Sequence, residues 1–251
     1  MIDFHSHILP CIDDGAESVE ISLQMLLDSY AQGVRTVIAT PHCFPTDDGG
    51  GIKNFLRIRE KSYNTLMKAI EEDGRTFPEV RLGCELCVMD DIPDMKRISS
   101  LCIEGTNYIL TEMPYKRWSV NHYDFIYSLQ LKGLRPIMAH IERYKRSKEE
   151  FYNLFSFDLL YQVNADSFLG RDYKRFMPYL FENGAVQFLG SDMHNTTTRV
   201  SNIKKAAEVI AANYGQDRFD YLMENAKKAL NNESIQRIAY PKMSFWEKLK
   251  L

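Results

Sequence analysis

This chain of 251 residues has few cysteines and no long hydrophobic run. Its five cysteines are an odd number, which argues against a disulfide scaffold and for reduced thiols, as in the cytoplasm. No segment approaches the roughly 18 to 20 consecutive apolar residues of a transmembrane helix. The first apolar motif starts at Ile2, which leaves no room for a secretory signal. We therefore expect a cytoplasmic protein without a transmembrane segment.

Blocks of like charge are also missing. The 31 Lys and Arg residues and 34 Asp and Glu residues are mixed along the chain, and the formal net charge is -3. Nucleic-acid binding usually shows as a basic patch or stripe. We therefore expect no nucleic-acid partner, and nuclease activity is disfavoured.

Several catalytic motifs are absent. No cysteine is followed six positions later by arginine, so the thiolate loop of cysteine-dependent phosphatases is lacking. Gly-x-Ser-x-Gly, Gly-x-x-x-x-Gly-Lys and Gly-x-Gly-x-x-Gly do not occur either. Cys84 and Cys87 match Cys-x-x-Cys, but they span a predicted strand end rather than the start of a helix. We expect Cys84 to pack behind Glu85, with redox or zinc use as the alternative.

What the sequence does contain is a set of short apolar runs, six of which end in a histidine or a carboxylate. These runs are residues 2–7, 36–42, 80–85, 108–112, 136–140 and 186–194. A seventh run, 159–163, has no ionisable residue at its end. Segments with helical spacing lie between the runs, and this alternation is typical of βαβ units in a parallel sheet. We predict one barrel-like domain over residues 1–251, with 244–251 as a short apolar and basic tail.

The predicted helices follow from apolar side chains that recur every three to four residues, as Val19, Leu23 and Leu26 do. They cover residues 18–32, 54–72, 121–132, 148–155, 172–183, 202–213 and 218–230. Two unusual loops, 44–52 and 114–120, follow strands and would suit a rim that closes over a ligand, although plain surface loops are an equal alternative.

Ionisable side chains gather at the predicted carboxyl ends of the strands. His5 and His7 point the same way because side chains alternate along a strand, and so do Asp192 and His194. A closed barrel makes the first and last strands neighbours and places functional groups at this end. The full set is His5, His7, Asp14, His42, Glu85, Glu112, His140, Asp192 and His194. Any one of them alone could be a hydrogen-bonded core histidine or a paired carboxylate, but nine together predict a polynuclear metal site.

The charge of this set bears on the number of cations. Two divalent ions would neutralise its four carboxylates, whereas three would leave a charge of about +2, which favours a phosphate dianion. Imidazole and carboxylate ligands without thiolate suit Mn, Fe or Zn. Arg143 and Arg199 follow His140 and His194 closely, and guanidinium groups bind phosphate oxygens in pairs of hydrogen bonds. A surface salt bridge is the alternative for each arginine.

Five motifs resemble the polymerase and histidinol phosphatase (PHP) superfamily, and within it the CpsB/CapC-type bacterial tyrosine-protein phosphatases of capsule and exopolysaccharide systems. The motifs are HSHILP at 5–10, DDGA at 13–16, ATPH at 39–42, HIERY at 140–144 and SDMH at 191–194. The resemblance implies a distorted (β/α)7 TIM-like barrel with three divalent metal ions, commonly manganese.

The resemblance also implies a ligand set for each ion. One ion would be held by His5, His7, Glu85 and Asp192, and a second by Glu85, Glu112 and His140. A third would be held by Asp14, His42 and His194. Arg143, Arg199 and Asp192 are then the candidate catalytic residues, with the arginines binding the phosphoryl group. Cys11 departs from the family pattern, which usually has glycine there, and a positive φ at Cys11 would strain the loop that carries Asp14.

These expectations combine into one hypothesis: a metal-dependent phosphatase that hydrolyses phosphotyrosine on a protein. The implied substrate is the tyrosine cluster of a membrane-associated bacterial tyrosine kinase that regulates capsule or exopolysaccharide synthesis. Phenolate, with a pKa of about 10, leaves more easily than an alkoxide, so a strong general acid is not required. The alternatives are a small-molecule phosphomonoesterase such as a histidinol phosphatase, and a non-catalytic metal-bound docking protein.

Overall fold

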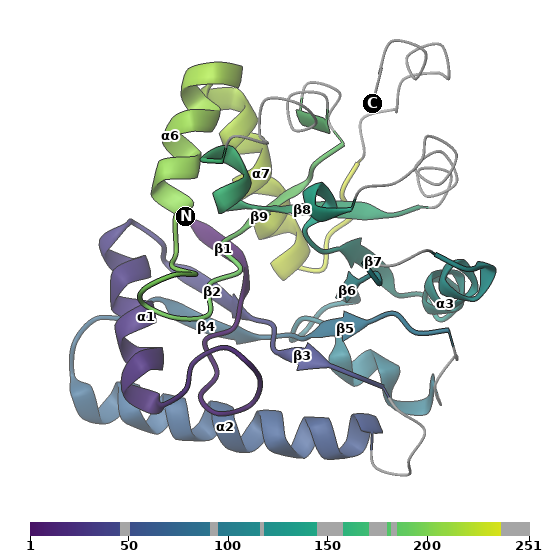
Figure 1. Ribbon diagram of the computed structural model, residues 1–251, viewed down its shortest axis with the longest axis horizontal. Helices are drawn as coiled ribbons and strands as arrows, with labels where there is room; N and C mark the ends of the chain where they lie inside the picture. Colours follow the sequence, from purple (N-terminus) through teal and green to yellow (C-terminus); the bar gives the residue numbers. More distant parts are fainter. Residues whose placement is uncertain are drawn as a thin grey trace.

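Parallel strands alternate with helices along the chain and form a curled sheet with helices around it (Figure 1). The computed structural model describes residues 1–45, 51–90, 95–115, 118–144, 158–170, 180–181 and 185–236. The predicted helices at 148–155 and 172–183 lie outside these residues or nearly so, as does the 244–251 tail. The loops at 44–52 and 114–120 are described only in part.

The strands fall into two hydrogen-bonded groups, and every pair is parallel. In the first group β1 (Ile2–Ser6) pairs with β2 (Thr36–Ala39), and β2 pairs with β4 (Glu79–Leu82). The second group has the order β3 (His42–Cys43), β5 (Glu85–Cys87), β6 (Tyr108–Glu112), β7 (Arg135–Met138), β8 (Leu160–Asn164) and β9 (Phe188–Gly190).

Two of the predicted strands are interrupted. The 36–42 run becomes β2 and β3, and the 80–85 run becomes β4 and β5. Pro41 lies at the first interruption and has no N–H to donate to a neighbouring strand, and Gly83 lies at the second. The groups that follow each interruption are His42 and Glu85, so both breaks occur just before a predicted ligand.

The first and last strands are neighbours, as predicted. The Asp192 N–H donates to the His5 carbonyl over 2.8 Å, and the His7 N–H donates to the Met193 carbonyl over 2.9 Å. The rings of Phe4 and Phe188 stack with their centroids 4.0 Å apart. These contacts bring the amino-terminal and carboxy-terminal ligand motifs to the same edge of the sheet.

Five of the predicted helices are present within a few residues of their expected bounds. They are α1 (Val19–Ala31), α2 (Gly51–Asp73), α3 (Val120–Leu131), α6 (Ile203–Tyr214) and α7 (Gln216–Leu230). The Ser18 hydroxyl accepts a hydrogen bond from the Ile21 N–H at the start of α1, and Gly33, with φ of 90°, follows its end. No helix among the described residues is long and apolar enough to cross a membrane.

Two apolar clusters support the sheet. One combines strand residues such as Phe4, Ile38 and Phe188 with Ala226 and Ala229 of α7. The larger cluster packs the alternate strand residues against α1, α2, α3 and α6. Because apolar packing fixes both faces of the strands, the polar groups at the strand ends are held on a rigid frame.

Candidate metal centre

The structure brings all nine predicted ligands into one cluster. His5 lies in β1, His42 begins β3, Glu85 begins β5 and Glu112 ends β6. The others follow their strands directly or lie in the loop after β1. The pairing of β1 with β2 shifts register between Asp3 and Ser6, an irregularity of the kind found beside active sites, where it re-aims side chains.

The buried half of the cluster gathers four ligand atoms around one point. The Nε2 atom of His5 lies 3.1 Å from His7 Nε2, 3.2 Å from Glu85 Oε2 and 3.6 Å from Asp192 Oδ1. His7 Nε2 is 3.3 Å from Glu85 Oε2 and 3.4 Å from Asp192 Oδ1. A cation with bonds of about 2.0 to 2.2 Å to nitrogen and oxygen holds neighbouring ligand atoms roughly 3.0 to 3.6 Å apart. His5, His7 and Asp192 therefore fit a single cation, and Glu85 Oε2 lies beside both imidazoles.

Glu85 is the central carboxylate of the cluster, with two further histidines beside it. Its Oε1 atom lies 2.8 Å from His140 Nε2, and its Oε2 atom lies 3.1 Å from His42 Nδ1. Glu112 is next to both histidines, 3.4 Å from His140 Nε2 and 3.9 Å from His42 Nδ1. His42, Glu85 and Glu112 also form one of the three groups that could hold a metal ion. The family resemblance implied only that His42 lies with Asp14 and His194, so its contact with Glu85 was not expected.

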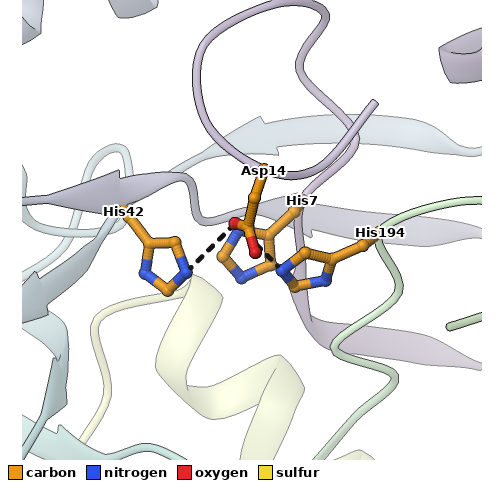
Figure 2. A group of neighbouring side chains, drawn as sticks. All are labelled: His7, Asp14, His42 and His194. Carbon is orange, nitrogen blue, oxygen red and sulfur yellow. Dashed lines mark ion pairs between the residues drawn. The ribbon is translucent and has the colours of Figure 1, made fainter. Parts of the chain in front are cut away.

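The more open half is built around Asp14 (Figure 2). Its Oδ1 atom lies 3.4 Å from Nε2 of His42 and 3.4 Å from Nε2 of His194, and His7 completes the group. The Asp14 side chain is 63% exposed, whereas that of His194 is 1% exposed. This part of the cluster therefore faces solvent through Asp14.

Three histidines present Nε2 to the cluster because their Nδ1 atoms have other partners. His5 Nδ1 lies 3.1 Å from Gln162 Oε1, which accepts and so requires the proton on Nδ1. His7 Nδ1 lies 2.7 Å from Asp13 Oδ2, and His194 Nδ1 lies 2.9 Å from the Asp192 carbonyl. Nε2 of His194 is buried without a hydrogen-bond partner. An outer partner that fixes the tautomer in this way is characteristic of histidines that bind metals.

Sequence reasoning missed the residues that orient these rings. Gln162 and Asn164 lie on β8, the strand whose end has no ionisable group, and both face the cluster. Gln162 Nε2 donates to Asn164 Oδ1 over 2.9 Å, and Asn164 Nδ2 donates to Asp192 Oδ2 over 2.8 Å. The spacing of two amides two residues apart on a strand was the available signal.

Asp3 shares a strand face with His5 and His7, but its hydrogen bonds go to backbone groups and not to the imidazole rings. Its carboxylate accepts instead from the backbone N–H of Ser191 over 2.7 Å and from that of His5 over 3.4 Å. Burial raises the pKa of Asp3 to about 6, and these hydrogen bonds oppose the rise. Asp3 therefore holds the backbone of β1 against the segment after β9.

The cluster shifts the pKa values of its members in opposite directions. Burial alone would raise the pKa of Glu85, but His5, His140 and His42 hold it well below its usual range. Burial would lower the pKa of His140, yet Glu112 and Glu85 raise it to about 9. Burial and the nearby His7 lower the pKa of His194 to about 4. A cation that binds here at neutral pH must therefore displace a proton from His140.

The two predicted arginines both reach the cluster. An Nη2 hydrogen of Arg143 is donated to Asp192 Oδ2, and Arg199 donates to the same oxygen over 3.0 Å. Arg199 Nη1 is also 3.6 Å from Asp14 Oδ2. Their side chains are 34% and 38% exposed. Each guanidinium thus lies between the buried ligands and solvent, where an incoming anion would meet it.

Left-handed backbone occurs at three positions in or beside the cluster. The φ angles are 34° at His140, 53° at Asp192 and 57° at Cys11. Non-glycine residues rarely adopt this region, and such strain gathers at functional sites. Cys11 thus has a positive φ, which is the condition under which it would strain the loop that carries Asp14.

The Cys84 and Cys87 pair does not form a thiolate site. Cys84 is buried and its thiol donates to the Leu101 carbonyl over 3.3 Å. Burial raises the pKa of Cys87 to about 11. All five cysteines are free thiols, and His122 accepts from the Ser119 N–H at the start of α3.

The fold and this cluster define the class of the protein: an α/β domain whose strand ends carry groups that can hold divalent cations. A sequence model described as "Capsular polysaccharide synthesis, CpsB/CapC" matches residues 1–231. The chain therefore belongs to the CpsB/CapC family, as its motifs predicted.

Characterised relatives extend over nearly the whole chain. Tyrosine-protein phosphatase YwqE of Bacillus subtilis (strain 168) is 33% identical over 246 residues, which span 94% of this chain and 94% of YwqE. Tyrosine-protein phosphatase CpsB of Streptococcus agalactiae serotype V is 29% identical over 252 residues, 94% of this chain and all of CpsB. A solved structure from work on YwqE and the Streptococcus pneumoniae CpsB, "unique metal-dependent tyrosine phosphatases", matches with a TM-score of 0.80 at 31% identity. That match covers 94% of this chain and 97% of the other.

Proposed function

We propose that this protein is a metal-dependent tyrosine-protein phosphatase. The observation that carries the proposal is the convergence of Arg143 and Arg199 on Asp192, whose other oxygen faces His5 and His7. Two guanidinium groups beside a cation-binding cluster suit a doubly charged phosphoryl group. The names and high coverage of the relatives support the same activity.

Three divalent ions are the proposed occupants, manganese first, with iron or zinc as alternatives. The ligand groups are His5, His7, Glu85 and Asp192 for one ion, Glu85, Glu112 and His140 for the second, and Asp14, His42 and His194 for the third. The contacts of His42 on both of its ring nitrogens support a position between the second and third ions. Bound divalent ions would lower the pKa of a water molecule and offset the charge of the phosphate.

The protein's own residues would bind and orient the substrate. Arg143 and Arg199 would leave their shared contact with Asp192 and donate to phosphoryl oxygens, while Asn164 keeps its hydrogen bond to Asp192. Because the leaving phenolate has a pKa of about 10, it departs without a strong acid beside it. Asp192 then serves both as a proposed ligand and as the group that holds the arginines ready.

A distorted (β/α)7 barrel over residues 1–251 is the proposed architecture. If β2 with β3 and β4 with β5 each count as one interrupted strand, the described residues contain seven strands. The hydrogen bonds between the His5–His7 segment and residues 192–193 support closure between the two ends. The cytoplasm is the proposed location. The proposed substrate is the phosphotyrosine of a membrane-associated bacterial tyrosine kinase in capsule synthesis, in keeping with the description of the family.

Steady-state comparison of a phosphotyrosine peptide with histidinol phosphate, both with manganese, tests the activity. We expect kcat/KM to favour the peptide, whereas a clear preference for histidinol phosphate would support the small-molecule alternative. The double variant His5→Ala, His7→Ala should lose hydrolysis because it removes two of the four ligands proposed for the first ion. Full activity in that variant would refute the metal mechanism, and an inactive wild type would favour a docking role.

A further inference from the structure

Two large aromatic side chains are exposed beside the metal centre. Phe44 is 57% exposed and Tyr115 is 58% exposed. The Phe44 ring lies 6.1 Å from the His42 ring, and the Tyr115 ring lies 6.2 Å from the His140 ring with only 7° between their planes. Both of these histidines contact Glu85, so a single imidazole ring separates each aromatic side chain from the central carboxylate.

The sheet places the two rings on either side of a single strand. Phe44 follows β3 and Tyr115 follows β6, and β5 lies between those strands. At about 4.8 Å per strand, the axes of β3 and β6 are roughly 10 Å apart. Aromatic rings pack with centroids about 4.5 to 7 Å apart. A phenyl ring bound between the ends of these two strands would therefore lie within reach of both side chains.

Tyr115 is also tied to a residue that would bind the phosphoryl group. Arg143 Nη1 donates to the Tyr115 hydroxyl over 3.3 Å. The Tyr115 ring lies 6.0 Å from the Tyr144 ring, and the Tyr144 hydroxyl accepts from the Met113 N–H over 3.0 Å. When the phosphate of a substrate binds to Arg143, the atoms that carry the phosphate would lie near the Tyr115 ring.

We infer that Phe44 and Tyr115 form an aryl subsite that selects phosphate esters of phenols over those of alcohols. This inference rests on the proposed phosphatase function and names the feature that directs it to phosphotyrosine. The phosphoryl group binds to the cations and the arginines. The phenyl ring of the substrate lies between the two aromatic side chains. An alkyl phosphate would fill only the phosphoryl half of the site.

Binding of two non-hydrolysable phosphonates tests the subsite without leaving-group chemistry. Phenylphosphonate and methylphosphonate share the charged head and differ in the ring. Calorimetry on manganese-loaded protein should show phenylphosphonate binding about tenfold more tightly. Phe44→Ala and Tyr115→Ala should each reduce that preference about threefold, and together abolish it. The affinity for inorganic phosphate should fall less than the affinity for phenylphosphonate.

Two further variants separate this role from others. Tyr115→Phe keeps the ring and loses the hydroxyl, so it should retain the phenyl preference. If it behaves like Tyr115→Ala, Tyr115 acts through Arg143 and the aryl subsite is wrong. Tyr127→Ala on α3 removes a similarly exposed tyrosine, 52% exposed, and should have no effect.

The same measurements distinguish the two levels of the proposal. Equal affinity of wild type for both phosphonates would overturn the subsite, even if the protein hydrolyses phosphotyrosine peptide well. A wild type that hydrolyses no phosphotyrosine peptide would overturn the proposed function, while the phosphonate comparison would still decide whether the subsite exists. With active enzyme, the two alanine variants should raise KM for a phosphotyrosine peptide more than they raise KM for a phosphoserine peptide.

Discussion

Asp13 is not a proposed metal ligand, but its carboxylate contacts the imidazole of His7, which is one. Its Oδ2 atom lies 2.7 Å from His7 Nδ1 and accepts from the His42 N–H over 3.0 Å, and its Oδ1 atom accepts from Gly15 over 2.9 Å. Its pKa is about 2, because contacts with His7 outweigh the effect of burial. Asp13 thus keeps a negative charge behind His7 at any moderate pH.

Asp13→Asn should weaken metal binding about 10-fold to 100-fold, because a carboxylate behind a ligating histidine raises the basicity of the ring. Calorimetric titration of manganese into chelator-treated protein measures the change, and activity should return at high manganese. Asp217→Asn, an exposed carboxylate on α7, is the control. Unchanged affinity in Asp13→Asn would show that Asp13 does not act through His7.

His140 should make the stability of the metal-free protein depend on pH. Its pKa is about 9 when folded, against 6.5 as the ordinary value. A raised histidine pKa stabilises the fold fully below the unfolded value and loses that contribution as the pH rises through the folded value. Urea unfolding of chelator-treated protein should therefore show a loss of about 2 to 3 kcal/mol between pH 6.5 and 9.

Manganese affinity should rise over the same pH interval, because the proton on His140 leaves when a cation binds. His140→Gln should flatten the pH dependence of stability, although His7, whose pKa is also raised, keeps part of the slope. A stability that rises from pH 6.5 to 9 would contradict the assigned protonation of His140.

Cys11 offers a test of backbone strain. Because φ at Cys11 is 57°, Cys11→Gly should raise the free energy of unfolding by about 1 kcal/mol. The same change should tighten cation binding at Asp14, His42 and His194. Asn232→Gly, at the same φ of 57° but in the turn after α7, should affect stability without any change in metal binding. Urea unfolding and manganese titration of both variants make the comparison. No gain in Cys11→Gly would mean that the loop carries no strain there.

The nine ligand candidates could be predicted because ionisable residues at strand ends are visible in the sequence. Gln162 and Asn164 were missed because a search for charged groups passes over amides, although their spacing on a strand was visible. Asp13 was hidden for another reason: its contact with His7 depends on how the loop turns at Gly15, and neighbouring aspartates look alike in a sequence. Whether the nine bind cations as assigned stays a prediction.

Among the elements, the positions of the helices could be predicted from the periodicity of apolar residues, but the number of strands could not. The apolar spacing of α1, α2 and α7 is a local property, so their bounds were predicted within a few residues. The split of β2 from β3 and of β4 from β5 depends on which neighbour each residue pairs with. That information lies in other parts of the chain, and a single run of apolar residues does not contain it.

Gly190 controls how closely β9 approaches β1. A Cβ atom on Gly190 would lie 2.5 Å from His5 Cβ and 2.9 Å from Gln162 Nε2. Gly190→Ala should therefore destabilise the fold by about 2 to 3 kcal/mol and displace His5 from the cluster. Gly170→Ala, which would meet only the Asp166 carbonyl at 3.9 Å, is the matched control. Equal urea midpoints for the two variants would refute this view of the β1 and β9 contact.

For the whole molecule, the cluster joins ligands from both ends of the chain, so bound cations should stabilise the entire fold. Manganese at about a thousand times its Kd should add roughly 4 kcal/mol per site. Thermal unfolding with manganese and with chelator measures the difference in Tm, and the His5→Ala, His7→Ala variant should lose most of it. An identical Tm under both conditions would argue against occupied sites.

The contact of β1 with the segment after β9 also determines when, during synthesis, the buried ligand set can form. His5 and His7 leave the ribosome well before Asp192 and His194, because about 185 residues separate His7 from Asp192. A nascent chain, or a fragment cut short before Asp192, has neither the second half of the buried ligand set nor the partner that holds Arg143 and Arg199. If these residues bind cations as proposed, binding must follow synthesis of residues 192–194, and fragments that end before Asp192 should be inactive.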